Sequence, residues 1–193
     1  LKTSKKIREN NISKINEIEE EMNNDFFIDQ NYVLKVTEKT NEIIIFCRET
    51  RETNKYNVPL RKEIHGFDKF LDGCRYTLIN DKAYITGGRD QNNCYDFFIE
   101  FDLVNNIVIK LPFMNFPRAY HCMVFNENFK KIFCLGGELN KTCEFYDLFH
   151  NKWNVLPDLS HPRAYINPYF SAVKQKKNEM KLKEKEKVIN LFT

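Results

Sequence analysis

The chain has 193 residues, of which 42% are hydrophobic and 14% aromatic, enough apolar material for one packed domain and a tail. Its formal net charge is +3, but residues 174–187 hold seven Lys and three Glu, or +4, so the rest of the chain carries −1. A near-neutral body with one short basic run argues against a nucleic-acid partner. No apolar run reaches the roughly 20 residues that a membrane helix needs, so no membrane partner is expected.

Residues 1–25 predict an amphipathic helix or a short coiled coil. Ile7, Ile12, Ile15, Ile18 and Met22 fall within one stripe at helical periodicity, and charged residues occupy the opposite face. An apolar stripe of this kind can pair with another chain. Self-association through residues 1–25 is therefore one expectation for this protein.

From residue 26 onward the pattern changes to short β-prone runs separated by Asn, Asp and Gly turns. The runs expected to form strands are Tyr32–Val36, Glu42–Phe46, Tyr76–Ile79, Ala83–Thr86, Phe97–Phe101, Ile107–Ile109, Cys122–Phe125 and Lys131–Leu135. Evenly spaced short strands predict an all-β sandwich, barrel or propeller.

The six cysteines show no metal-binding spacing, since none forms a C-x-x-C pair and none is placed with a histidine as in a zinc finger. Free thiols in a reducing compartment are the simplest interpretation, which predicts a cytoplasmic location. The four histidines are scattered along the chain. We therefore expect no metal ligands, no cofactor and no catalytic residues.

A repeat runs through the second half of this region. Pro117-Arg-Ala-Tyr120 recurs as Pro162-Arg-Ala-Tyr165, Leu111-Pro112 as Leu156-Pro157 and Asp102 as Asp147, each 45 residues later, whereas Gly87-Gly88 recurs as Gly136-Gly137, 49 residues later. A cysteine follows each second glycine by six positions, at Cys94 and Cys143. Both cysteines are expected to be small buried residues that begin a third strand.

These motifs together resemble the kelch repeat. The second copy is the fullest, with Pro117-Arg118-Ala-Tyr, a strand ending in Gly136-Gly137, Tyr146-Asp147, then Trp153 and Leu156-Pro157. The first copy has Phe101-Asp102 in place of Tyr-Asp and Val108 or Ile109 where Trp is usual, and Ile43–Pro59 reads as a worn earlier copy. The resemblance implies a partial, incomplete β-propeller of about three four-stranded blades over residues 26–173.

The repeated residues have physical roles in such blades. Gly87, Gly88, Gly136 and Gly137 would allow positive φ and close backbone approach at a strand end. Tyr146 and Trp153 would fill the wedge between neighbouring blades. Asp102 and Asp147 would begin the turn to the outer strand. Residues 174–193 then form a Lys/Glu-rich tail, a solvated helix or a disordered segment.

The resemblance implies a non-catalytic module that binds another protein through loops at one end of the blades. Arg118, Tyr120, Arg163 and Tyr165 are the candidate contact residues, because Arg and Tyr combine large contact area with directed hydrogen bonds. The alternative is that these repeated side chains mainly stabilise blade packing. Kelch proteins include substrate-recognition adaptors and cytoskeleton-associated scaffolds, and either role fits this chain.

Three blades are fewer than the roughly four to eight of a closed propeller. Either the chain is a piece of a longer propeller or its open blade edges associate with another copy. A propeller enzyme of the oxidase or sugar-epimerase type is an alternative function, disfavoured because the Tyr/His/Cys ligand grouping is missing. A degenerate gene fragment without function is the third alternative.

Overall fold

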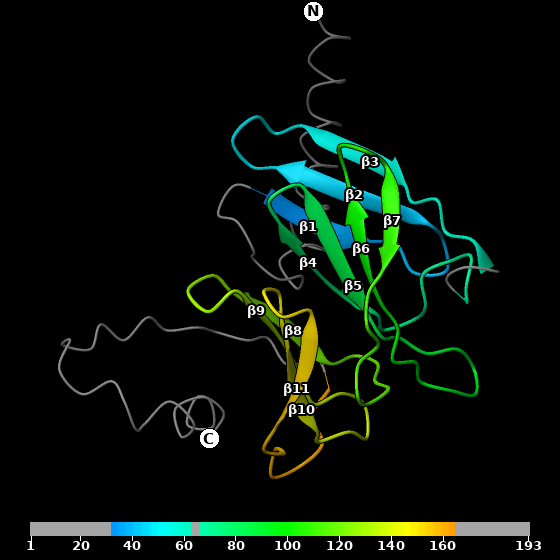
Figure 1. The fold of residues 1–193 in the computed structure, drawn as a ribbon. Helices are drawn as coiled ribbons and strands as arrows, with labels where there is room; N and C mark the ends of the chain where they lie inside the picture. The colour runs from blue at the N-terminus through cyan, green and yellow to red at the C-terminus, as the bar shows by residue number, and fades with distance from the viewer. Residues whose placement is uncertain (1–31, 63–65, 165–193) are drawn as a thin grey trace, which may run out of the picture.

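The computed structural model describes residues 32–62 and 66–164, and this part of the chain contains eleven strands (Figure 1). They are β1 (Tyr32–Val36), β2 (Glu42–Cys47), β3 (Thr53–Asn57), β4 (Arg75–Ile79), β5 (Lys82–Thr86), β6 (Phe98–Asp102), β7 (Ile107–Lys110), β8 (Cys122–Asn126), β9 (Lys131–Leu135), β10 (Cys143–Asp147) and β11 (Lys152–Leu156). The helix expected over residues 1–25 and the tail over 174–193 lie outside the described residues.

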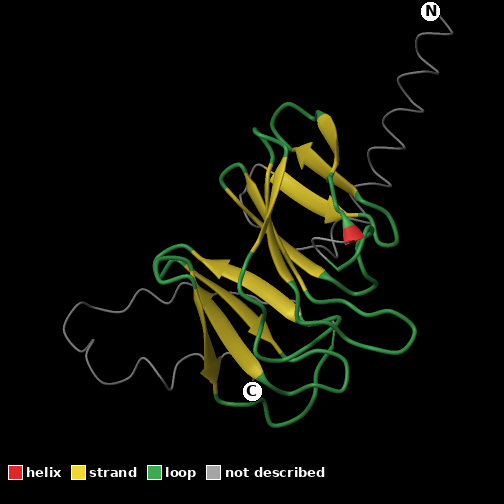
Figure 2. Ribbon diagram, turned by 45° about the vertical axis from the view of Figure 1, so that its right-hand side comes forward, coloured by secondary structure: helices red, strands yellow, loops and turns green. Residues whose placement is uncertain are grey.

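The strands form three antiparallel meanders, which we call the first, second and third blades. The first contains β1-β2-β3, the second β4-β5-β6-β7 and the third β8-β9-β10-β11, each in sequence order. Strand β4 contacts both β1 and β8, so the blades are neighbours in chain order (Figures 1 and 2). The all-β fold class and the partial propeller of about three blades are thereby confirmed, although the first blade has three strands among the described residues where four were expected.

Each of the eight predicted runs coincides with a strand, and most of these strands bury side chains on both faces of their blade, whereas β7 is largely exposed. Three strands lie outside those eight runs: β10 and β11 were expected only from the kelch resemblance, and β3 was not predicted, since its sequence, Thr-Asn-Lys-Tyr-Asn, is polar and mostly exposed. It forms as the outer strand by pairing with β2, and the half-buried Tyr56 packs on Phe101 of the second blade.

The expectation for Cys94 was wrong. Cys143 is buried and begins β10, but Cys94 is exposed in a loop where it makes only an isolated bridge to Arg89. The extra residues after Cys94 delay the third strand of the second blade until Phe98. Counting back from the shared Asp102 and Asp147, Phe98 is the residue that corresponds to Cys143.

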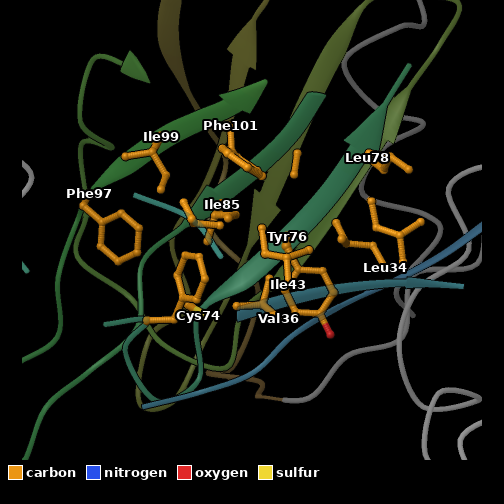
Figure 3. Close-up of a cluster of buried hydrophobic side chains, with 14 of the residues drawn as sticks. Leu34, Val36, Ile43, Cys74, Tyr76, Leu78, Ile85, Phe97, Ile99 and Phe101 are labelled. Carbon is orange, nitrogen blue, oxygen red and sulfur yellow. The ribbon is translucent and has the colours of Figure 1, made fainter. Parts of the chain in front are cut away.

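The space between the first and second blades is filled by apolar side chains (Figure 3). Strands β1 and β2 contribute Leu34, Val36 and Ile43, and the second blade contributes residues such as Tyr76 and Ile99. These side chains are almost completely removed from water, which is the main favourable term in the packing of one blade on the next. Among the described residues, no helix has the length and apolar character to cross a membrane.

Candidate functional site

The two Gly-Gly pairs form the same joint in successive blades. The amide of Gly88 donates to the carbonyl oxygen of Arg118, and the amide of Gly137 donates to that of Arg163, both at 2.8 Å. The preceding glycines have positive φ, and a Cβ on Gly87 would lie 2.3 Å from the Arg118 oxygen. Glycine is required there because a side chain would push the Pro-Arg-Ala-Tyr loop off the blade.

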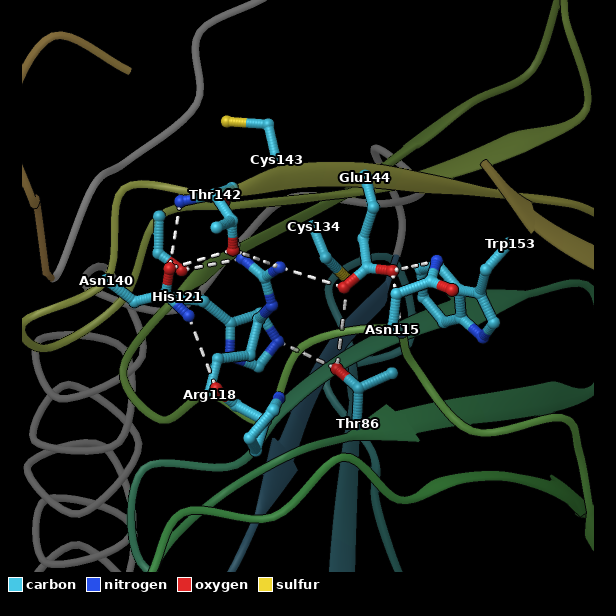
Figure 4. Close-up of polar contacts among 12 residues, drawn as sticks. Thr86, Asn115, Arg118, His121, Cys134, Asn140, Thr142, Cys143, Glu144 and Trp153 are labelled. Carbon is cyan, nitrogen blue, oxygen red and sulfur yellow. Dashed lines mark hydrogen bonds and ion pairs between the residues drawn. The ribbon is translucent and has the colours of Figure 1, made fainter. Parts of the chain in front are cut away.

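The side chain of Arg118 is fully buried between the second and third blades (Figure 4). Its Nη1 donates to the carbonyl oxygens of Gly136 and Thr142, at 2.7 and 2.8 Å. Its Nη2 donates to Thr142 Oγ1 at 3.0 Å and to Glu144 Oε1 at 2.8 Å. The guanidinium therefore ties the loop after β7 to the strand ends of the third blade.

Glu144 on β10 is the buried counter-ion of Arg118. Its second carboxylate oxygen accepts from the backbone and side-chain nitrogens of Asn115, both at 2.9 Å. Both terminal nitrogens of Arg118 and both oxygens of Glu144 are thus hydrogen-bonded, which offsets much of the cost of burying the charges, while Arg118 Nε has no partner among the described residues. The arrangement gives Arg118 the blade-stabilising role that was the alternative expectation, and its burial leaves it no surface to offer a partner.

The other arginine of the repeat is placed differently. Arg163 is exposed, although its carbonyl makes the same joint as that of Arg118. Tyr165 lies outside the described residues. Of the four predicted contact residues, the described structure therefore leaves Tyr120 and Arg163 at least partly open to solvent.

Tyr146 and Trp153 lie in the wedge between the second and third blades. Their rings pack against each other and against Phe98 of β6, with centroids 4.8–5.2 Å apart. Trp153 Nε1 donates to the carbonyl oxygen of Pro112 at 2.7 Å. Asp102 and Asp147 each accept two backbone amides of the following turn, which fixes the entry to the outer strands.

Tyr120 is the centre of a mixed-charge group at the loop end of the blades. We define the Tyr120 cluster as Glu38, Asp72, Arg75, Arg89, Tyr120 and Glu138. Tyr120 has a φ of 54°. Its ring packs so closely on Gly73 that a Cβ added to Gly73 would lie 2.8 Å from a ring carbon of Tyr120. The Arg75 guanidinium carbon lies 5.8 Å from the centre of the same ring.

Opposite charges from different blades meet around this tyrosine. Arg89 of the second blade forms an ion pair with Glu138 of the third. Burial raises the pKa of Glu38, which shares a hydrogen bond with Asp72. Burial also acts to raise the pKa of Asp72, but hydrogen bonds from Glu38 and Tyr120, together with the charges of Lys39 and Arg89, lower the net pKa.

Sequence reasoning singled out only Tyr120 from this cluster. One signal for two others was present, because Arg89 directly follows Gly87-Gly88 and Glu138 directly follows Gly136-Gly137. Residues at matching positions of two successive repeats lie on adjacent blades, so two such residues of opposite charge can form an ion pair. Glu38, Asp72 and Arg75 stand at no repeated position, so no pattern pointed to them.

His121, which directly follows Tyr120, is completely buried, and its carbonyl oxygen accepts a hydrogen bond from Arg75 Nε. Its Nε2 is 2.8 Å from Thr86 Oγ1, and its Nδ1 has no hydrogen-bond partner among the described residues. Burial, together with the charges of Arg118 and Arg75, lowers its pKa well below the ordinary value of 6.5. His121 is therefore a neutral structural residue at physiological pH.

We expect acidification to weaken the fold through His121. A lowered folded pKa means that the stability is complete above the ordinary pKa of 6.5 and is lost as the pH falls below it. The unfolded chain then binds a proton that the folded chain refuses, so the free energy of unfolding should fall by up to about 1.4 kcal/mol per pH unit. Urea denaturation at a series of pH values between about 6.5 and 5 measures the slope.

The His121→Gln variant is the control, because an amide can still bond to Thr86 but does not titrate. In this variant the free energy of unfolding should fall less steeply with decreasing pH over the same interval, by the contribution of one proton. Carboxylates with a lowered pKa, such as Asp72, lose their contribution only at lower pH, and Glu38, whose pKa is raised, titrates in both proteins and cancels in the difference between the slopes. Equal slopes in the two proteins would contradict the assignment.

The side chains that could bind a metal are dispersed in the part of the chain that the structure describes. No three His, Cys, Asp or Glu side chains gather there as metal ligands. The six cysteines all fall within these residues and are free thiols, and burial raises the pKa of Cys74 and of Cys134 to about 12. Thiols with such a pKa are poor nucleophiles.

Comparison with known proteins finds a similar protein among those that are curated. Over 138 residues, or 67% of this chain, the sequence is 29% identical to a RING finger domain and kelch repeat-containing protein of Dictyostelium discoideum. The chain spans only 13% of the length of that relative. No protein-family model matches the chain.

Proposed function

We propose that this chain, whose sheets are arranged as propeller blades and whose sequence is similar to a kelch repeat-containing protein, is a non-catalytic module that binds a protein partner through the Tyr120 cluster. The observation that carries the proposal is the convergence of an aromatic ring and charges of both signs, contributed by all three blades, at one loop end. Tyr and Arg are the residues most often found at the energetic centres of protein interfaces.

The geometry of the joint supports this role. The buried Arg118–Glu144 pair and the Gly-Gly joints hold the loop that carries Tyr120, so the ring is positioned before a partner arrives. Binding by such a preorganised group loses little conformational entropy. Arg163, the matching residue in the next copy of the repeat, is exposed and is proposed as an additional contact.

Of the finer roles, we propose a substrate-recognition adaptor rather than a cytoskeleton-associated scaffold. The supporting observation is that the similar protein combines kelch repeats with a RING finger domain in one chain. In that similar protein the kelch repeats share a chain with a second type of domain, and an adaptor needs a second domain besides the one that binds the substrate. A cytoplasmic location stays a prediction from the composition.

Affinity capture with a charge-swapped variant tests the binding surface. Arg89→Glu combined with Glu138→Arg keeps an ion pair between the blades but reverses the local field that a partner meets. The wild type should retain the partner. In the swapped variant and in Tyr120→Ala the affinity for the partner should fall by at least about tenfold, because central contacts of this kind are worth about 1.4 kcal/mol or more.

Phe149→Ala is the matched control. Phe149 is 84% exposed in the β10–β11 turn, at the end of the third blade away from the Gly-Gly joints, so its removal should leave capture unchanged. Thermal melting of each variant separates lost contact from lost folding. Unchanged capture by the folded swapped variant, or equal loss in Phe149→Ala, would refute the proposal.

A further inference from the structure

The outer strand of the second blade differs from the other two outer strands. Ile107 and Ile109 of β7 are 53% and 44% exposed. Counted back from the proline that follows each outer strand, Ile107 corresponds to Asn54 in β3 and Lys152 in β11. Natural edge strands are usually protected by polar or charged side chains. β3 and β11 follow that rule at this position, although Val155 near the end of β11 is exposed.

The backbone of β7 also has one free edge. Strand β7 pairs with β6, and among the described strands it has no second neighbour. The amide of Leu111 donates to the carbonyl oxygen of Phe98, which sets the alternation of the antiparallel pair. The amide and carbonyl groups of Val108 and Lys110 therefore point away from β6, toward the outside of the blade.

We propose that β7 pairs with β7 of a second copy of this chain, antiparallel, with Val108 opposite Val108 of that copy. The two valines would then exchange two backbone hydrogen bonds across a twofold axis. In this register Ile107 lies opposite Ile109 of the second copy on one face, so four isoleucines form a continuous apolar row.

Charge and flanking residues favour a second copy as the occupant. Lys110 is the one charged residue of β7, and in this register it falls opposite the neutral Asn106 of the second copy, so no like charges meet. Val104 and Phe113, which are 74% and 43% exposed, flank the strand at its two ends and extend the apolar contact. The edge is thus complementary to itself, as a twofold interface requires.

Sedimentation velocity of the full chain over a wide concentration range tests this pairing. The wild type should pass from monomer to dimer as its concentration rises, and Ile107→Lys combined with Ile109→Lys should stay monomeric. Val155→Lys is the matched control, because Val155 is a 58% exposed residue of the outer strand of the third blade. It should dimerise like the wild type.

Ile107→Thr combined with Ile109→Thr serves if the lysine variant does not fold, since threonine keeps the β-branched shape and strand preference. This pair should weaken the dimer by at least about tenfold in the dissociation constant, through loss of apolar burial. A wild type that is monomeric at every concentration overturns the proposal, as does a dimer that survives both isoleucine variants or is equally lost in Val155→Lys. The variants of the Tyr120 cluster leave β7 intact, so failure of the binding proposal would not change this result.

Discussion

Replacing Glu144 with isoleucine is expected to lower the free energy of unfolding by about 3–5 kcal/mol, because it leaves the charge of Arg118 buried without a counter-ion. Both side chains are completely shielded from water, so solvent cannot take over the lost interaction. Asn115 would also lose the acceptor for two hydrogen bonds. Urea denaturation followed by the fluorescence of Trp153, the only tryptophan, measures the change.

A double variant separates the ion pair from the packing. The residue of the second blade that corresponds to Glu144 is Ile99. It lies in an apolar cluster with Phe70, whose carbonyl accepts from Lys39 as that of Arg118 accepts from Gly88. Arg118→Met combined with Glu144→Ile copies that apolar solution, so its loss of stability should be smaller than the sum of the two single losses.

An exposed ion pair of the same blade is the control for charge alone. Lys141 lies 3.3 Å from Asp158 with both side chains about half exposed, and Lys141→Ala should cost less than about 1 kcal/mol. If Glu144→Ile cost no more than Lys141→Ala, the buried pair would not be what joins the blades.

Trp153→Ala should destabilise the fold by about 3–5 kcal/mol, because it opens a cavity in the wedge between the second and third blades. The indole is only 6% exposed and packs on Phe98 and Tyr146. Its removal also leaves the Pro112 carbonyl without its donor. Circular dichroism during urea denaturation is the measurement, since the variant has no tryptophan.

Trp153→Phe distinguishes the ring from its hydrogen bond. Phenylalanine keeps most of the aromatic packing but cannot donate to Pro112, so it should cost clearly less than alanine, with about 1 kcal/mol assigned to the hydrogen bond. A near-zero change for Trp153→Ala would show that the wedge is not packed as described.

The strands and their grouping into blades could be predicted from the sequence, because both depend on local chemistry. A strand with two packed faces needs runs of apolar residues, and the joint after β5 or β9 needs glycine, so Gly87 and Gly136 recur with those runs. Strand β3 escaped prediction because an outer strand with one face in water needs few apolar residues.

The roles of the repeated polar residues were decided only by the tertiary structure. Pro-Arg-Ala-Tyr reads the same in both copies, yet Arg118 is buried against Glu144 while Arg163 is exposed. The counter-ion of Arg118 stands 26 positions away on another strand. Likewise the Tyr120 cluster draws its charges from three blades, and proximity between residues so far apart in sequence is set by how the blades pack, which no local pattern records.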